Sequence, residues 1–253
     1  YTGQGVVVAV IDTGVDWDHS DLVSQIWVNA GEIAGNGIDD DRNGYIDDTR
    51  GWDFVSNDNN PDDVEGHGTH VAGSVAASNN GAGATGVAPG ARIMPVRVLG
   101  NDGSGSSSAV AAGIRYAAAN GARIINLSLG GSLSSSIQSA IQYAQSLNVL
   151  VVAAAGNESA AVPSYPARHS ATFTNTISVG AYNSSYALAS FSNDVGASGA
   201  VQVDAPGVSI YSTVPNGSYA TYSGTSMAAP HVAGLAALAL SANSNLTASQ
   251  LRT

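Results

Sequence analysis

Apolar residues follow two patterns along the chain. Short unbroken apolar runs, rich in β-branched residues, predict strands that are buried on both faces. They cover residues 6–11, 92–99, 124–129, 149–155 and 176–181. Segments with helical spacing or a high content of small residues separate most of these runs, over 67–77, 108–120 and 133–147. Strands that alternate with helices predict an α/β fold. We expect one doubly wound domain over residues 1–253, with a mostly parallel central sheet and helices on both faces.

A further helix is predicted near the end of the chain. Residues 228–240 are small and apolar on every side, which indicates a buried helix. Ser226 lies just before this run, so its N–H and its hydroxyl would be presented at the positive end of the helix dipole. Two functions fit that place: Ser226 is either an N-cap or a nucleophile. A nucleophilic serine needs a base and an orienting carboxylate elsewhere in the chain.

Composition narrows the choice of chemistry. The chain has 253 residues, of which 44% are hydrophobic, so a sizeable core is possible. It contains no cysteine, which excludes a thiol nucleophile and a zinc–thiolate site. The formal net charge of −11 disfavours binding to nucleic acid or to an anionic membrane. No uninterrupted apolar run is long enough to cross a bilayer, and we therefore expect neither kind of partner.

A base and a carboxylate are available at suitable places. Asp12 follows the first predicted strand, and His67 begins the first predicted helix. With Ser226 they stand in the chain order Asp, His, Ser, which is one of the known orders of a serine hydrolase triad. Taken singly, Asp12 could be a strand-end carboxylate and His67 a helix-capping histidine. His70 is a rival base three residues on, and the residue pattern does not choose between the two histidines.

Three motifs carry a family resemblance. Residues 8–14 (VAVIDTG), 66–73 (GHGTHVAG) and 224–230 (GTSMAAP) resemble the signature motifs of the subtilisin-like serine proteases, and the likeness extends over almost the whole chain. The resemblance implies a serine endopeptidase with Ser226 as nucleophile and His67, the first histidine of its motif, as base. Asp12 would hold the imidazole tautomer. The same resemblance makes His70 a buried, hydrogen-bonded neighbour.

Further site residues follow from the same resemblance. Asn157, which follows Gly156 after the fourth strand, resembles the family's oxyanion-hole asparagine, although a turn asparagine is the alternative. Two segments resemble those that flank an extended substrate, and other residues resemble the walls of the primary specificity pocket. The expected substrate-binding residues are Gly103, Ser104, Gly105, Ser128, Leu129, Gly130, Ala154, Ala155, Gly156 and Ser164.

Acidic residues are concentrated in one insert. Eleven of the 19 acids lie between Glu32 and Glu65. Part of this insert has oxygen-bearing side chains at alternate positions and a glycine for a sharp turn, as in the front half of an EF-hand-type calcium loop. The closing glutamate is replaced by Arg50, so Asp47 or Asp48 would have to complete the site. The expected Ca²⁺ ligands are Asp39, Asp41, Asn43, Tyr45, Asp47 and Asp48. A solvated acidic loop is the alternative.

The resemblance also implies a second calcium site and several partners. Asp21 and Asn80 resemble side-chain ligands of the family's tight site, although a further ligand normally precedes the first strand. The chain is expected to be trimmed at both ends relative to the family, with a pro-segment outside it. Polypeptide substrates, a monomeric state and secretion to the extracellular space are the remaining expectations.

Three alternative functions stay open at this level. One is a specialised precursor-processing protease with the same chemistry. Another is a peptide-binding relative without catalysis, which the presence of all the triad types disfavours. The third is a serine esterase, whose usual motif has glycine two residues before and two after the serine. Gly224 fits that motif, but Ala228 does not.

Overall fold

The computed structural model describes residues 1–253 and contains a seven-stranded sheet in the order β2-β3-β1-β4-β5-β6-β7, with every pair parallel. Its strands are β1 Val7–Asp12, β2 Trp52–Asp53, β3 Arg92–Arg97, β4 Ile124–Leu127, β5 Leu150–Ala154, β6 Thr176–Tyr182 and β7 Gln202–Pro206. A separate antiparallel hairpin contains β8 Ile210–Val214 and β9 Ser218–Tyr222. The α-helices are α1 His67–Ala76, α2 Ser107–Ala119, α3 Ser135–Ser146, α4 Thr225–Ala242 and α5 Ala248–Arg252. Two 3-10 helices, η1 Val23–Gln25 and η2 Ala167–Ala171, complete the structure.

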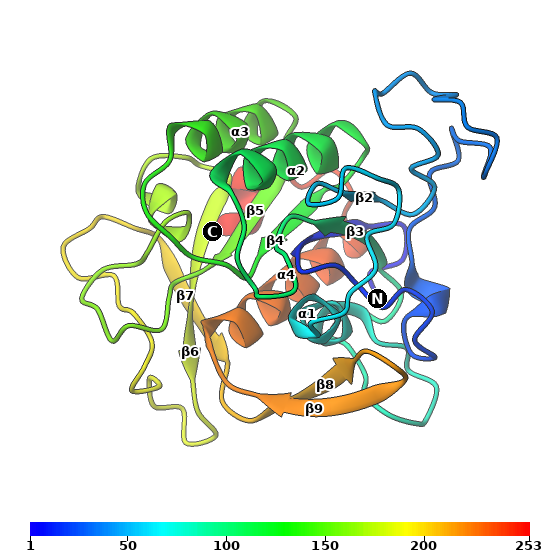
Figure 1. Cartoon of the computed structure of the whole chain (residues 1–253). Helices are drawn as coiled ribbons and strands as arrows, with labels where there is room; N and C mark the ends of the chain where they lie inside the picture. The colour runs from blue at the N-terminus through cyan, green and yellow to red at the C-terminus, as the bar shows by residue number, and fades with distance from the viewer.

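Helices cover both faces of the sheet, as Figure 1 shows. Alternate residues of β1 point to opposite faces, so Val8 and Val10 join one core while Ala9 and Ile11 join the other. The first core includes the inner faces of α1 and α4, and the second includes those of α2 and α3. Burial of both faces explains why the inner strands are continuous apolar runs. The expected α/β fold with a parallel sheet is confirmed.

Helix α4 is the central helix of the first core. It packs against β4, β5, β6 and β7 and against α1. It begins at Thr225, before the apolar run that predicted it, and continues through Pro230. By length and composition alone this helix is long and apolar enough to cross a membrane. The core helix of a globular protein passes the same test, and 56% of this helix is buried inside the structure.

Several elements of the structure lack an apolar pattern and were not predicted from the sequence. Strands β7 and β9 contain mostly exposed or half-buried residues, and β2 has only two residues. The expected helix over residues 133–147 is shorter, because Ser134 caps α3 by accepting a hydrogen bond from the Ile137 N–H. Leu133 lies outside the helix and is 61% exposed. Pattern alone therefore identified the inner strands and not the edge of the sheet.

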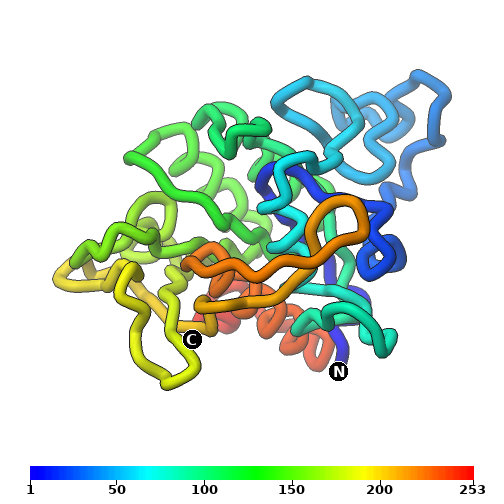
Figure 2. The backbone as a smooth tube through the Cα atoms, turned by 60° about the horizontal axis from the view of Figure 1, so that its bottom comes forward, coloured from blue at the N-terminus to red at the C-terminus, as the bar shows by residue number.

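The acidic insert lies between β1 and α1 and contains only short elements. It stands away from the body of the molecule as the blue and cyan loops in Figure 2. Asp48 anchors it to α2, because its fully buried carboxylate accepts a 2.6 Å hydrogen bond from the hydroxyl of Tyr116. The ring of Tyr45 packs edge-on against those of Trp52 and Tyr116. The insert is thus fastened to the second core at its base.

Candidate active site

Asp12 and His67 form the first pair of the site. Asp12 ends β1 and is fully buried, and His67 begins α1 directly after Gly66. The Nδ1 atom of His67 lies 2.8 Å from Oδ1 of Asp12. A side chain at position 68 would collide with the carbonyl of Gly14, so Gly68 allows the start of α1 to approach the end of β1 this closely. With Nδ1 bonded to the carboxylate, Nε2 is the free ring nitrogen.

The charges around His67 favour its protonated form. Burial alone would lower the pKa of His67, but the charge of Asp12 and its hydrogen bond to the ring outweigh that effect. The nearby carboxylates of Glu65 and Asp63 act in the same direction. The pKa of His67 is therefore raised above its ordinary value of 6.5.

This environment predicts a shift in the pH profile when Glu65 is replaced by glutamine. A base must be neutral, so kcat/KM should fall as the pH drops through the pKa of His67. Glu65 is exposed and raises that pKa, so Glu65→Gln should move the acid limb to lower pH. We expect about 0.2–0.7 pH unit, the scale of an exposed charge pair. The control is Asp204→Asn, which removes an exposed acid from β7. A limb that stays in place or moves upward contradicts this electrostatic role.

Ser226 lies next to this pair. It is the second residue of α4, and it lines a hollow of about 450 Å³ together with His67 and Asn157. Its hydroxyl donates a 3.1 Å hydrogen bond to the carbonyl of Ser128 rather than to His67. Gly224 occupies the N-cap position and no side chain caps the helix, so the alternative of Ser226 as N-cap is wrong. Catalytic hydrogen bonds are often unformed without substrate, so the bond to Ser128 is compatible with a nucleophilic role for Ser226.

His70 is unsuited to act as the base. Its ring is completely buried and stacks on Tyr222, with ring centroids 4.4 Å apart. Its Nε2 bonds the carbonyl of Ile210 at 3.0 Å. Burial lowers the pKa of His70 to about 4. The ring is thus neutral and held in the packing between α1 and the β8–β9 hairpin.

Asn157 is oriented by the first residue of α4. Its Oδ1 accepts hydrogen bonds from the N–H and the hydroxyl of Thr225, at 2.8 and 3.0 Å. This arrangement leaves Nδ2 free. That nitrogen lies 3.5 Å from where a Cβ on Gly224 would be, beside the turn that leads into Ser226. The amide donor and the main-chain N–H of Ser226 therefore occupy the same corner of the hollow.

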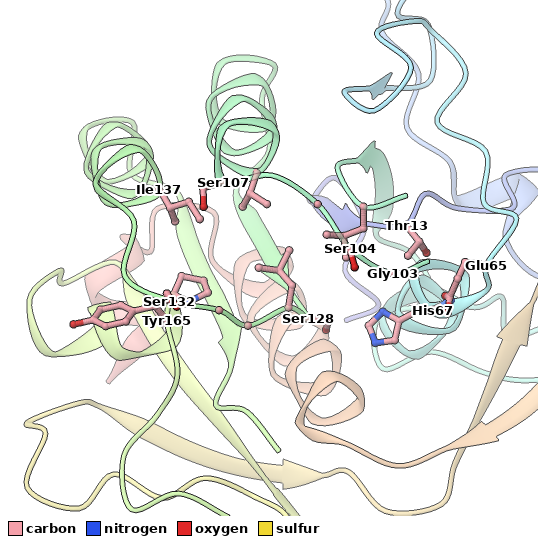
Figure 3. A pocket seen from close by; sticks show the side chains of 17 residues that line it. Thr13, Glu65, His67, Gly103, Ser104, Ser107, Ser128, Ser132, Ile137 and Tyr165 are labelled. Carbon is pink, nitrogen blue, oxygen red and sulfur yellow. The ribbon is translucent and has the colours of Figure 1, made fainter. Parts of the chain in front are cut away.

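A larger pocket of about 530 Å³ extends from His67 along the expected substrate segments. Figure 3 shows His67 and Glu65 on one side of it and Ser132 and Tyr165 on the other. The lining includes six of the expected substrate-binding residues, namely Gly103, Ser104, Gly105, Ser128, Leu129 and Gly130. Its lining joins the two segments that are expected to flank an extended peptide.

The remaining expected substrate-binding residues do not line this pocket. Ala154 and Ala155 are completely or almost completely buried, because β5 is covered on both faces. Ser164 is half-buried, and its Cβ lies 3.8 Å from where a Cβ on Gly130 would be. Gly156, at a φ of 108°, has the side chains of Asn193 and Glu158 packed against it. These four residues therefore do not line this pocket, and their part in substrate binding stays a prediction.

Three carboxylates near the site were missed in the sequence. Glu65 lines the pocket beside His67 and caps its N–H at 2.8 Å. Glu158 follows Asn157 and accepts hydrogen bonds from Asn193 and Ser164, which lower its pKa. Asp63 is 3% exposed. It accepts hydrogen bonds from Thr13, Thr69 and the main chain just before His67. Their positions next to motif residues were the only available signal.

Part of the acidic insert forms a cluster that could hold a cation. Carboxylate oxygens of Glu32, Asp39 and Asp41 all lie within 4.8 Å of one another. Glu32 was not among the expected ligands, because it lies seven residues before the motif. Three converging carboxylates suit a hard cation that takes oxygen ligands, and Ca²⁺ is the common one in flexible acidic loops.

The other expected ligands of this loop are engaged elsewhere. The Oδ1 of Asn43 accepts the N–H of Tyr45, whose ring packs in the aromatic cluster. Asp47 accepts the N–H groups of residues 36 and 37, and the carboxylate of Asp48 accepts bonds from Asn29, Asn43 and Tyr116. Asp47 and Asp48 thus brace the loop in this structure. Glu32 and Asp39 also accept main-chain N–H groups of the insert, and what distinguishes them is that their oxygens converge with those of Asp41.

Asp21 and Asn80, the expected ligands of the second calcium site, lie side by side and form a direct hydrogen bond. The amide of Asn80 donates to Asp21 at 2.9 Å, and the other carboxylate oxygen accepts from the hydroxyl of Tyr219 and the N–H of Ala84. These donors lower the pKa of Asp21 despite its burial. Because N–H and O–H donors already surround the carboxylate, a metal role for Asp21 and Asn80 stays a prediction.

Known proteins resemble the chain over nearly its whole length. The model of the subtilase family matches residues 3–253. Thermitase of Thermoactinomyces vulgaris is 46% identical over 93% of this chain and 75% of that protein. Subtilisin amylosacchariticus of Bacillus subtilis subsp. amylosacchariticus is 44% identical, and the chain spans 60% of its length. A cold-adapted subtilisin-like serine proteinase superposes with a TM-score of 0.81 at 38% identity, over 100% of this chain and 81% of that one.

The parallel α/β fold and these relatives define a serine endopeptidase that acts on polypeptides. The chain belongs to the subtilase family.

Proposed function

We propose that the chain hydrolyses peptide bonds through an acyl-enzyme on Ser226. The observation that carries this proposal is the 2.8 Å contact of Asp12 with Nδ1 of His67, which leaves Nε2 for the hollow shared with Ser226. In the first step the hydroxyl oxygen attacks the substrate carbonyl carbon while Nε2 takes its proton. Asp12 keeps the ring in the required tautomer and stabilises the imidazolium.

The remaining steps use the same groups. The tetrahedral oxyanion accepts hydrogen bonds from Nδ2 of Asn157 and from the N–H of Ser226. Collapse breaks the C–N bond, and His67 returns the proton to the leaving amine. Water then attacks the ester, with His67 again as base. The acyl C–O bond breaks, His67 returns the proton to the oxygen of Ser226, and the carboxylic acid is released. The active hydroxyl first has to leave the Ser128 carbonyl and turn to His67.

The substrate would lie extended along the pocket. The segments 103–105 and 128–130 line it, and their glycines leave main-chain groups accessible for pairing with a peptide strand. The surface of the pocket is mostly uncharged, so we propose an endopeptidase with broad substrate preference. Secretion, a monomeric state and a separate pro-segment are further proposals that rest on the family resemblance alone.

Covalent labelling tests this mechanism. A fluorophosphonate reacts with an activated serine and has little need for a peptide groove. We expect stoichiometric labelling of Ser226, identified by peptide mapping, and matching loss of peptide hydrolysis. Labelling at another serine, or hydrolysis that survives full labelling of Ser226, contradicts the mechanism.

We also propose that the acidic insert binds Ca²⁺ through Glu32, Asp39 and Asp41. The support is the convergence of their carboxylate oxygens within 4.8 Å. A bound cation would neutralise this charge and order the connection between β1, which ends at Asp12, and α1, which begins at His67. Its effect is on stability and on the spacing of the pair, and it takes no part in the chemistry.

Removal of calcium should therefore destabilise the protein. Ligand at 100 times its Kd stabilises by about 2.7 kcal/mol, which corresponds to roughly 5–11 °C in the melting temperature of a chain of this size. Chelation should lower the melting temperature and the labelling rate of Ser226, and Ca²⁺ should restore both. Mg²⁺ should not restore them, since it requires a smaller octahedral site.

Two variants make this test specific. Asp39→Asn with Asp41→Asn should abolish the response to calcium, measured by calorimetric titration and by melting. Asp58→Asn is the matched control, because it removes an exposed acid from the same insert but outside the cluster. If calorimetry detects no bound ion and chelation leaves the melting temperature unchanged, the insert is a solvated acidic loop.

A further inference from the structure

The main-chain carbonyl of Ser226 lacks the usual hydrogen-bond donor of its own helix. In an α-helix the carbonyl of a residue accepts the N–H of the residue four positions later. Four positions after Ser226 is Pro230, which has no N–H, and α4 continues through it. Ser226 is half-buried, and a carbonyl shielded from water in this way is stabilised when another group supplies the hydrogen bond.

The side chain of Ser128 supplies this hydrogen bond. Its hydroxyl donates to the carbonyl of Ser226 at 2.7 Å. The same hydroxyl oxygen accepts a 2.9 Å hydrogen bond from Nδ2 of Asn126. Asn126 is on β4 and completely buried, and Ser128 follows the end of that strand and is 3% exposed. Because a hydroxyl has one hydrogen, accepting from Asn126 leaves its hydrogen directed at Ser226.

Ser226 in turn bonds back to the same residue. Its hydroxyl donates to the main-chain carbonyl of Ser128 at 3.1 Å. Two hydrogen bonds of opposite direction thus join the first turn of α4 to the end of β4. When the hydroxyl of Ser226 turns to His67, only the bond from the Ser128 side chain remains of the two that join Ser226 to Ser128. The main chain of Ser226 also carries the N–H proposed as an oxyanion donor.

We propose that Asn126 and Ser128 are positioning residues for the nucleophile, and that Pro230 creates the need for them. The proposal rests on the role of Ser226 argued above. It gives Ser128 a function beyond lining the substrate groove: its hydroxyl holds the Ser226 main chain in the place that attack requires.

Labelling by a small fluorophosphonate separates this function from substrate binding. Ser128→Ala should slow labelling about tenfold, the scale of one lost buried hydrogen bond. For a peptide substrate the loss should be in kcat, with KM changed little. Asn126→Leu, at a position that does not line the pocket, should slow labelling in the same direction. Ser178→Ala is the matched control, because it removes another buried, hydrogen-bonded serine hydroxyl on the distant strand β6.

Pro230→Ala tests whether the missing N–H of Pro230 is the reason that Ser226 needs the hydrogen bond from Ser128. Alanine restores an N–H four residues after Ser226, and this N–H can bond the free carbonyl in place of the Ser128 hydroxyl. In the Pro230→Ala background, Ser128→Ala should therefore slow labelling by less than about threefold. A role in general stability would not give this rescue, since such losses add for independent changes.

The labelling experiments distinguish a failure of the catalytic role of Ser226 from a failure of the positioning role of Ser128. If the wild-type protein is not labelled at Ser226, the proposed catalytic role fails, and this proposal fails with it. If the wild-type protein is labelled and Ser128→Ala is labelled equally fast, with only KM raised, Ser128 merely lines the groove. An equal cost of Ser128→Ala in both backgrounds overturns the part assigned to Pro230. Where Ser128→Ala does not fold by circular dichroism, Asn126→Leu decides the question.

Discussion

Ser226→Ala should lower kcat about 10⁶-fold and leave the fold intact. The expected size is that of the loss caused by removing the catalytic serine of subtilisin. The physical reason is specific to the site: the Ser226 hydroxyl lines the hollow that His67 and Asn157 share, and its removal leaves the base without the oxygen that would attack the substrate. Steady-state hydrolysis of a peptide substrate measures the effect, and calorimetry checks that the melting temperature changes little.

The double variant Ser226→Ala with His67→Ala shows whether the serine and the histidine act as a unit. Once the nucleophile is absent, the base has no proton to take, so His67→Ala added to Ser226→Ala should cost little more. Ser241→Ala is a control for the loss of a hydroxyl on the same helix, far from the hollow. Wild-type turnover by Ser226→Ala would mean that another residue is the nucleophile and that the assigned mechanism is wrong.

Asn157→Ala should lower kcat by about 10²–10³ and change KM little. This range is that of the oxyanion-hole asparagine in subtilisin. The carboxamide meets the oxygen only when charge develops on it, so the loss appears in the transition state and not in substrate binding. In this structure the bonds from Thr225 fix Oδ1 and leave Nδ2 available, which prepares the donor before substrate arrives.

A matched variant checks this explanation. Asn183 also accepts main-chain hydrogen bonds through its Oδ1 but lies at a distant turn, so Asn183→Ala should leave kcat unchanged. Thr225→Val removes the hydroxyl that helps to orient Asn157, and should cause a smaller loss than Asn157→Ala. A change confined to KM in Asn157→Ala would show that the residue positions substrate and does not stabilise the oxyanion.

The sequence by itself determined the class of fold and the triad residue types. Continuous apolar runs identified the inner strands, because a parallel sheet covered on both faces allows few polar residues. The three motifs identified Asp12, His67 and Ser226, since each follows or begins an element whose pattern is visible. Edge strand β7 and the β8–β9 hairpin were missed, because exposed and half-buried residues give no clear periodicity.

Tertiary structure decided which polar groups meet. The choice between His67 and His70 depends on which ring reaches Asp12 and which is enclosed by the β8–β9 hairpin, and the residues between them do not encode that contact. In the insert, alternating oxygens predicted a loop. The joining of Glu32 to Asp39 and Asp41 requires the chain to turn back on itself.

The environment of Ser226 shows the same division. Pro230 is visible in the sequence, and its missing N–H implies an unpaired carbonyl at Ser226. That the hydroxyl of Ser128 supplies the donor follows only from the packing of α4 against the end of β4, where residues 98 positions apart come within 2.7 Å. Local sequence determines which groups lack partners, and long-range packing determines which groups satisfy them.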